Sequence, residues 1–130
     1  MPTSAPAIAV TGASGVVGAA VVAALAARGH RVVEIDRVGA HPVDVTDYAA
    51  LLARLADVDA VVHLAAVNSP DGRDVETNNQ AGTENVVRAC IELGIRRLVQ
   101  ASSVNAIGMA FSESPQFDYF PIDTEHAARP

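Results

Sequence analysis

Apolar residues along the chain gather in short runs that alternate with stretches of helical periodicity. Four short runs are rich in branched aliphatic side chains, which is typical of strands buried on both faces. These runs predict strands over residues 7–11, 31–35, 60–64 and 97–101.

The segments between these strands carry apolar residues at intervals of three and four, which predicts three helices. The first places apolar residues of segment 17–25 on one face and ends near Gly29. The second is a short leucine-bearing helix that Thr46 or Asp47 is suited to cap. The third runs from about residue 75 to residue 93.

Strands and helices therefore alternate as β-α-β-α-β-α-β, which predicts an α/β fold of Rossmann type with a doubly wound parallel sheet. Right-handed crossovers favour the strand order 3-2-1-4. Residues 1–108 are expected to form this region, and residues 109–130 to form an extended loop. The loop segment holds all three phenylalanines and shows no sustained periodicity.

Composition narrows the class of protein. The chain has 130 residues, half of them apolar, and a net charge of −6, which fits one globular domain and makes nucleic acid an improbable partner. The single cysteine, Cys90, excludes an internal disulfide. The longest apolar run, residues 16–27, is too short to span a bilayer and lacks preceding basic residues, so we expect no membrane partner and a cytoplasmic location. The scattered histidines predict no metal site.

A glycine-rich turn, TGASGVVG, joins the first strand to the first helix. Gly12 permits a tight turn, Gly15 permits close approach of a pyrophosphate, and Gly18 permits close helix packing. The start of the helix offers unpaired N–H groups to phosphates. An ordinary tight turn is the alternative, but the strand before it and the helix after it favour dinucleotide binding. The predicted cofactor-binding residues here are Gly12, Ala13, Ser14, Gly15, Val16, Val17 and Gly18.

Asp36 ends the second predicted strand, at the place where a carboxylate accepts hydrogen bonds from the ribose hydroxyls of an adenosine. A carboxylate there repels a 2′-phosphate, so NAD is favoured over NADP. Arg37 is adjacent and could bind such a phosphate, which leaves NADP open as the less favoured cofactor. A solvated charge at a strand end is the alternative interpretation of Asp36.

Several motifs together resemble the extended short-chain dehydrogenase/reductase family, in its NAD-dependent epimerase/dehydratase group. They are TGASGVVG, DVTD, HLAA, NQAGTENV and ASSVNAIG, and they spread over nearly the whole chain. The resemblance implies adenine contacts from Asp44 and Val45, a segment along the cofactor, and an ordering role for Asn79. It also implies that Ser103 is the catalytic serine. The further cofactor-binding residues that it implies are Leu64, Ala65, Ala66, Ala101 and Ser102.

The family resemblance also implies a catalytic tyrosine and lysine four positions apart, where the lysine lowers the tyrosine's pKa so that a phenolate accepts the substrate's proton. The chain contains no lysine, and the sequence after Tyr119 does not fit the motif. We therefore interpret the chain as the cofactor-binding part of a larger enzyme. His63, inside an apolar strand end, is interpreted as a packed structural histidine.

Two classes of function stay open at this point. The first is an NAD-dependent oxidoreductase or epimerase acting on a hydroxyl of a sugar, sugar acid or nucleotide sugar. The second is a non-catalytic dinucleotide-binding module, such as a redox sensor, or an inactive fragment. Retention of Ser103 favours the enzyme. An uncovered fourth strand would present unpaired backbone groups, so we expect self-association, or pairing with further chain, along that edge.

Overall fold

The computed structural model of the chain describes residues 5–68, 75–107 and 117–127. All predicted strands and helices are confirmed, each within a residue or two of its expected ends. In chain order they are β1 (Ala7–Thr11), α1 (Val16–Ala27), β2 (Arg31–Ile35), α2 (Tyr48–Arg54), β3 (Ala60–His63), α3 (Val75–Leu93) and β4 (Arg97–Gln100), followed by a short 3-10 helix, η1 (Val104–Ile107).

The four strands form one parallel sheet in the order β2-β1-β3-β4. The Rossmann-type α/β class is confirmed, but the predicted strand order 3-2-1-4 is wrong. Thr11, at the end of β1, stands opposite Ile35 of β2 on one side and His63 of β3 on the other. The central strand β1 therefore separates the second strand from the third.

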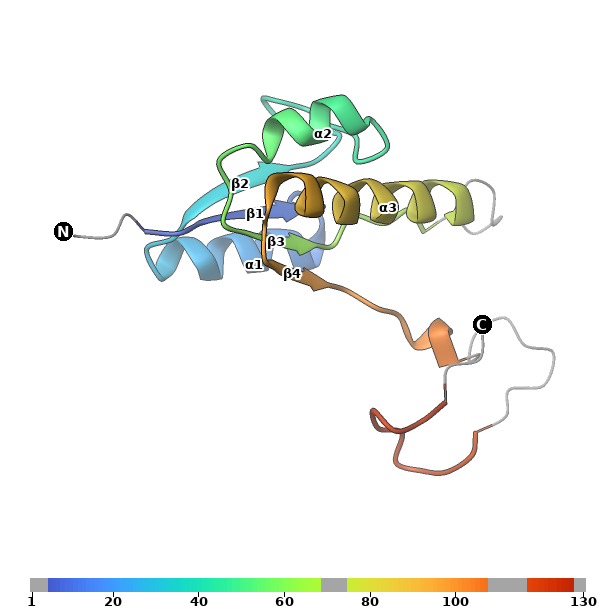
Figure 1. The fold of residues 1–130 in the computed structure, drawn as a ribbon. Coiled ribbons are helices and arrows are strands. Elements are labelled where there is room, and N and C mark those ends of the chain that lie inside the picture. The colour runs from blue at the N-terminus through green and yellow to red at the C-terminus, as the bar shows by residue number, and fades with distance from the viewer. Residues whose placement is uncertain (1–4, 69–74, 108–116, 128–130) are drawn as a thin grey trace. The chain divides into compact units, whose positions relative to one another are not determined.

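The helices explain the strand order. Figure 1 shows α1 on one face of the sheet and α2 and α3 on the other. Because Leu51 of α2 and Leu55, which caps the end of that helix, share a buried cluster with Val86 of α3, α2 is held on the α3 face. A right-handed crossover from β2 with its helix on that face places β3 on the far side of β1. No strand is assigned to the loop of residues 37–46.

The hydrophobic core lies between the sheet and the two helices α2 and α3. Ala9, Ile35 and Val61 contribute from three neighbouring strands, and all three are fully buried. The other face is covered by α1, in which Gly18 is the buried residue. Val17, expected on the inner face of that helix, is 62% exposed.

Two compact units divide the chain at Gln100 and Ala101. The first unit contains the whole sheet and its three helices. In the second, the rings of Phe117 and Tyr119 pack against the buried His126, with the Tyr119 and His126 rings 5.3 Å apart between centroids, and Phe120 packs against Phe117. The predicted loop of residues 109–130 lies partly outside the described residues.

The sheet has β2 and β4 as its edge strands. Val99 of β4 is 61% exposed. Association through this edge stays a prediction. Within the described parts of the chain, no helix combines the length and the apolar character needed to cross a membrane.

Candidate functional site

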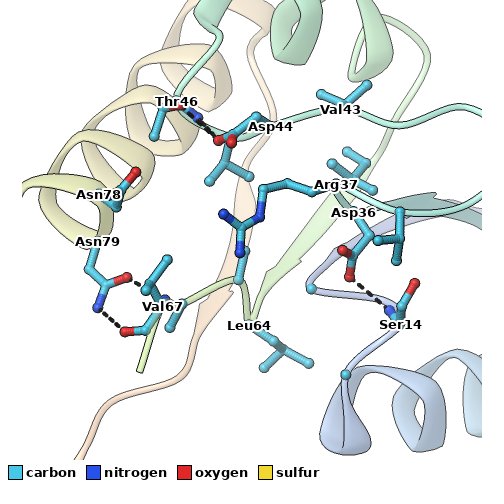
Figure 2. Close-up of a pocket in the computed structure, with 17 residues that line it drawn as sticks. Ser14, Asp36, Arg37, Val43, Asp44, Thr46, Leu64, Val67, Asn78 and Asn79 are labelled. Carbon is cyan, nitrogen blue, oxygen red and sulfur yellow. Dashed lines mark hydrogen bonds between the residues drawn. The ribbon is translucent and has the colours of Figure 1, made fainter. Parts of the chain in front are cut away.

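A pocket of roughly 330 Å³ opens at the carboxyl ends of β1, β2 and β3 (Figure 2). The chain leaves β1 toward one face of the sheet and leaves β3 toward the opposite face. The crevice therefore lies between β1 and β3, where the direction of the strand order reverses. Open parallel sheets bind ligands at this kind of position. The corrected strand order preserves the switch point because β1 remains central.

The glycine-rich turn forms one side of the pocket. Gly12 has a φ of +69°, and a Cβ added to it would lie 2.8 Å from the backbone nitrogen of Ala65. A Cβ on Gly18 would lie 1.9 Å from the Gly12 carbonyl oxygen. Gly18 was expected to bring the helix close to the sheet, and its nearest contacts are the Gly12–Ala13 backbone of the turn. The turn thus has no room for side chains at either glycine.

The first turn of α1 begins at Gly15 without a hydrogen bond from any capping side chain. Val16 and Val17 are 94% and 62% exposed, so their contribution to an anion site would come from backbone N–H groups. Ala13 is buried, and its N–H donates to the Ile35 carbonyl at 3.4 Å. It supports the turn from behind and does not line the pocket.

Asp36 reaches the turn from the end of β2. Its Oδ2 accepts a hydrogen bond from the Ser14 N–H at 2.9 Å, and its carbonyl accepts one from Val43 N–H at 2.7 Å. The bond from Ser14 ties the carboxylate to the glycine turn at the pocket wall (Figure 2), and the bond from Val43 fixes the Asp36 backbone. Arg37 also lines the pocket. Its positive charge helps to lower the pKa of Asp44.

A second loop, residues 44–46, forms the next part of the wall. The Asp44 Oδ1 accepts hydrogen bonds from the N–H and the hydroxyl of Thr46, at 2.9 and 2.8 Å, and these two bonds are the main cause of the lowered pKa of Asp44. Asn85 of α3 donates from Nδ2 to the carbonyls of Val45 and Thr46, at 2.9 and 3.0 Å. Gly82, one turn earlier on α3, leaves space for Val45, whose Cγ2 would lie 2.7 Å from an added Cβ.

The segment Leu64–Val67, after β3, completes the wall. Thr11 Oγ1 accepts hydrogen bonds from the N–H groups of Leu64 and Ala65, both at 3.1 Å. Asn79 of α3 pairs with the Val67 backbone in both directions, accepting from its N–H at 2.7 Å and donating to its carbonyl at 3.0 Å. Helix α3 therefore holds two separate walls of the same pocket, through Asn79 and Asn85.

The pocket collects many of the residues predicted from sequence. Those lining it are Gly12, Ser14, Gly15, Asp36, Arg37, Asp44, Val45, Leu64, Ala65, Ala66 and Asn79. Sequence reasoning missed a group of neighbours that also line it, namely Ile35, Val38, Val43, Thr46, Val67 and Asn78. Most of these adjoin a predicted residue in the sequence, so extending each motif by one or two residues would have included them. Asn85 was missed although it lies within NQAGTENV.

Ala101, Ser102 and Ser103 belong to the second unit, and their predicted roles stay predictions. All three are exposed. Tyr119, in the same unit, donates its hydroxyl proton to Asp123 Oδ1 at 2.6 Å, which raises the pKa of Tyr119 to about 12. This phenol is therefore a poor base at neutral pH. Among the residues that the structure describes, no cluster of acidic, histidine or cysteine side chains is arranged to hold a metal ion.

Comparison with known proteins gives a family and several relatives. The family model of NAD dependent epimerases and dehydratases matches residues 8–128. The 2-alkyl-3-oxoalkanoate reductase of Stenotrophomonas maltophilia is 37% identical over 108 residues, which cover 74% of this chain and 33% of the reductase. The 3-beta-hydroxysteroid dehydrogenase of Mycolicibacterium neoaurum is 33% identical over 117 residues, covering 75% of this chain and 32% of the dehydrogenase.

Solved structures agree with this family. A short-chain dehydrogenase/reductase superfamily protein from Agrobacterium tumefaciens, solved with bound NAD, has a TM-score of 0.84 and 31% identity, covering 95% of this chain and 39% of that one. The UDP-N-acetylglucosamine 4-epimerase of Bacillus cereus has a TM-score of 0.78 and 31% identity, covering 97% and 48%. The chain spans about a third of the length of the two curated relatives named above. This chain belongs to the NAD-dependent epimerase/dehydratase family.

Proposed function

We propose that the chain forms the NAD-binding part of an oxidoreductase or epimerase that acts on a hydroxyl of a carbohydrate-type substrate. One observation carries the cofactor proposal: the glycine turn, the Asp36 carboxylate and the two α3-held loops all meet around one pocket. A bound nicotinamide dinucleotide supplies a hydride acceptor or donor.

The residues present fit that cofactor. The turn excludes side chains where a pyrophosphate would lie, and the uncapped start of α1 offers N–H donors to it. Asp36 keeps one carboxylate oxygen on Ser14, and its other oxygen would accept from the ribose hydroxyls. The negative charge of Asp36 favours NAD over NADP, whose 2′-phosphate it would repel, and Arg37 is the group that could favour NADP.

The carbohydrate substrate is the finer part of the proposal. It is supported by the likeness to a UDP-N-acetylglucosamine 4-epimerase, at 31% identity. The curated relatives named above instead act on steroids and 3-oxoalkanoates. The reactions that these names describe all take place at a carbon that bears a hydroxyl or a keto group. A substrate panel therefore needs sugars, sterols and hydroxyalkanoates as separate arms.

A non-catalytic dinucleotide-binding role is the second candidate. The observation that favours it is the hydrogen bond between Tyr119 and Asp123, because it raises the pKa of the one tyrosine in the second unit to about 12. The 130 residues also contain no lysine that could lower it.

Two measurements test the proposal. Calorimetric titration of the chain with NAD and with NADP should give tighter binding of NAD, and equal or reversed affinities would contradict the assignment of Asp36. Absorbance at the NADH band, followed with each substrate arm, should stay flat for the 130 residues alone. Turnover by this chain alone would overturn the view that its proton acceptor lies elsewhere.

A further inference from the structure

His63 is a buried polar residue beside the pocket to which the proposed function assigns no role. It is 3% exposed and directly precedes Leu64. Its Nδ1 lies 2.6 Å from Thr11 Oγ1, at the end of the neighbouring strand, and its Nε2 lies 3.4 Å from Thr83 Oγ1 of α3. Gln100 of β4 donates to the same Thr83 oxygen at 3.4 Å. The ring thus links the end of β1 to α3, and Thr83 links α3 to β4.

The hydrogen bonds of the Thr11 hydroxyl determine which nitrogen of His63 carries the proton. A hydroxyl oxygen has two lone pairs and one proton. Its lone pairs receive the N–H of Ala65 and the N–H of Leu64, the latter shared with the Thr11 carbonyl at 3.2 Å. The proton of the hydroxyl is then left for its third neighbour, the Nδ1 of His63.

We propose that His63 is a positioning residue for the cofactor: its unprotonated Nδ1 accepts the Thr11 hydroxyl proton and thereby aims both lone pairs of Thr11 at the Leu64–Ala65 backbone. The ring is then the neutral tautomer that carries its proton on Nε2 and donates it to Thr83. This inference rests on the proposed function, because Leu64 and Ala65 line the pocket assigned to the dinucleotide.

The surroundings of the ring favour the neutral form. The side chains within hydrogen-bonding distance of the ring are Thr11 of β1 and Thr83 of α3, and Gln100 of β4 bonds Thr83 in turn; none of these three is charged. Burial lowers the pKa of His63 below its ordinary value of 6.5. Protonation of Nδ1 would place a third donor against an oxygen that already accepts two, so one contact to the pocket wall would have to break.

Proton linkage gives the sign of the pH effect. Below pH 6.5 the unfolded chain binds a proton at this histidine that the folded chain resists, so stability falls as the pH falls through that range. Above pH 6.5 neither state binds the proton, and this contribution is constant. Cofactor affinity should fall at lower pH, as the pH approaches the lowered pKa at which His63 in the folded chain becomes protonated.

The tautomer is measured directly by the ¹⁵N chemical shifts of the imidazole in the 130-residue chain, with His63→Asn identifying the signal by its disappearance. At pH 7 we expect a bare Nδ1 and a protonated Nε2. A ring protonated on Nδ1, alone or together with Nε2, would overturn the proposal. This result does not depend on whether the chain binds NAD.

Matched variants test the positioning role. His63→Leu removes the contact and should weaken NAD binding about tenfold, as expected for one lost hydrogen bond. Thr11→Val removes the hydroxyl with all three of its contacts and should weaken NAD binding at least as much. Thr11→Ser and His63→Asn keep a hydroxyl or an acceptor and should bind within about threefold of the wild type, a difference well under 1 kcal/mol. Thermal melting shows which variants remain folded.

The pH profile separates positioning from mere packing. Wild-type affinity for NAD should decline as the pH falls through the pKa of His63, which lies below 6.5, whereas His63→Asn should show a flatter profile. If the wild type binds NAD and the two profiles coincide, His63 does not position the pocket wall. If the wild type binds no NAD at all, the proposed function fails, and the ¹⁵N shifts still decide the proton assignment.

Discussion

The two sides of the pocket are held in place by different kinds of contact. On the glycine-turn side, backbone packs directly on backbone, and a Cβ at Gly18 would lie 1.9 Å from the Gly12 oxygen. On the opposite side, two loops are tied to α3 by side-chain amides, Asn79 to Val67 and Asn85 to the carbonyls of residues 45 and 46.

This difference determines how strongly a substitution on each side affects ligand binding. A backbone contact leaves no space for an added atom, so substitution there forces the turn to open. A hydrogen bond from a side-chain amide contributes about 0.5–1.5 kcal/mol to stability, so its loss loosens a loop while the fold persists. We therefore expect an abrupt loss of binding on the turn side and graded losses on the α3 side.

The largest effect is expected for Gly18→Ala. The new Cβ would displace the Gly12–Ala13 backbone, abolishing measurable NAD binding and lowering the unfolding free energy by about 1–3 kcal/mol or more. Calorimetry and chemical denaturation measure the two quantities. Gly29→Ala is the control, because a Cβ there meets no atom within 4 Å. Its φ of +80° costs about 1–2 kcal/mol of stability, with NAD affinity unchanged.

Asp36→Ala should have the next largest effect. It removes the acceptor of the Ser14 N–H and the carboxylate expected to bind the ribose, so NAD affinity should fall by about 1–3 kcal/mol. Asp57→Ala, at an exposed aspartate outside the pocket, is the matched control. Equal NAD affinity for these two variants would remove Asp36 from the adenosine site.

Asn85→Ala tests the α3 side. The change frees the loop at residues 45 and 46, so binding of ADP-ribose should weaken by about 1–2 kcal/mol, while nicotinamide mononucleotide should be unaffected. Gln80→Ala, an exposed residue of the same helix that bonds Glu84, serves as the comparison. A loss shared equally by both ligands would show that Asn85 supports the fold generally and not the loop predicted to contact adenine.

The smallest effect is expected for Tyr119→Phe, which should leave NAD affinity unchanged. The tyrosine's own ionisation offers a positive readout, since the bond to Asp123 raises the pKa of Tyr119 to about 12. Ultraviolet titration of a Tyr48→Phe variant, in which Tyr119 is the remaining tyrosine, should show its midpoint near pH 12. A midpoint near or below 10 would mean that Asp123 does not hold the phenol.

Features that depend on neighbouring residues in the chain were predictable from the sequence. The strands and the helices follow from local periodicity. Turn chemistry limits the cap of α2 to Thr46 or Asp47, and the structure places it at Asp47. The need for glycine at position 12 also follows, because it has a positive φ in a tight turn. These features require no knowledge of which elements meet in space.

Features that depend on contacts between elements distant in the sequence were not predictable from local patterns. The strand order was wrong because the packing of α2 on α3 selects the face of the crossover, and periodicity does not report that choice. The bonds from Asn85 join residues about 40 positions apart. Similarly, His63 was correctly interpreted as buried, but its contact with Thr11 spans 52 positions.

The central claim is that one pocket, built from the glycine turn, Asp36 and the Leu64–Ala66 segment, binds the cofactor. Backbone amide NMR shifts recorded during titration of the 130-residue chain with NAD test it most directly. We predict saturable shifts concentrated at Gly12–Gly18, Asp36 and Leu64–Ala66. Saturable binding with shifts confined to other residues, or no binding at all, would contradict the account.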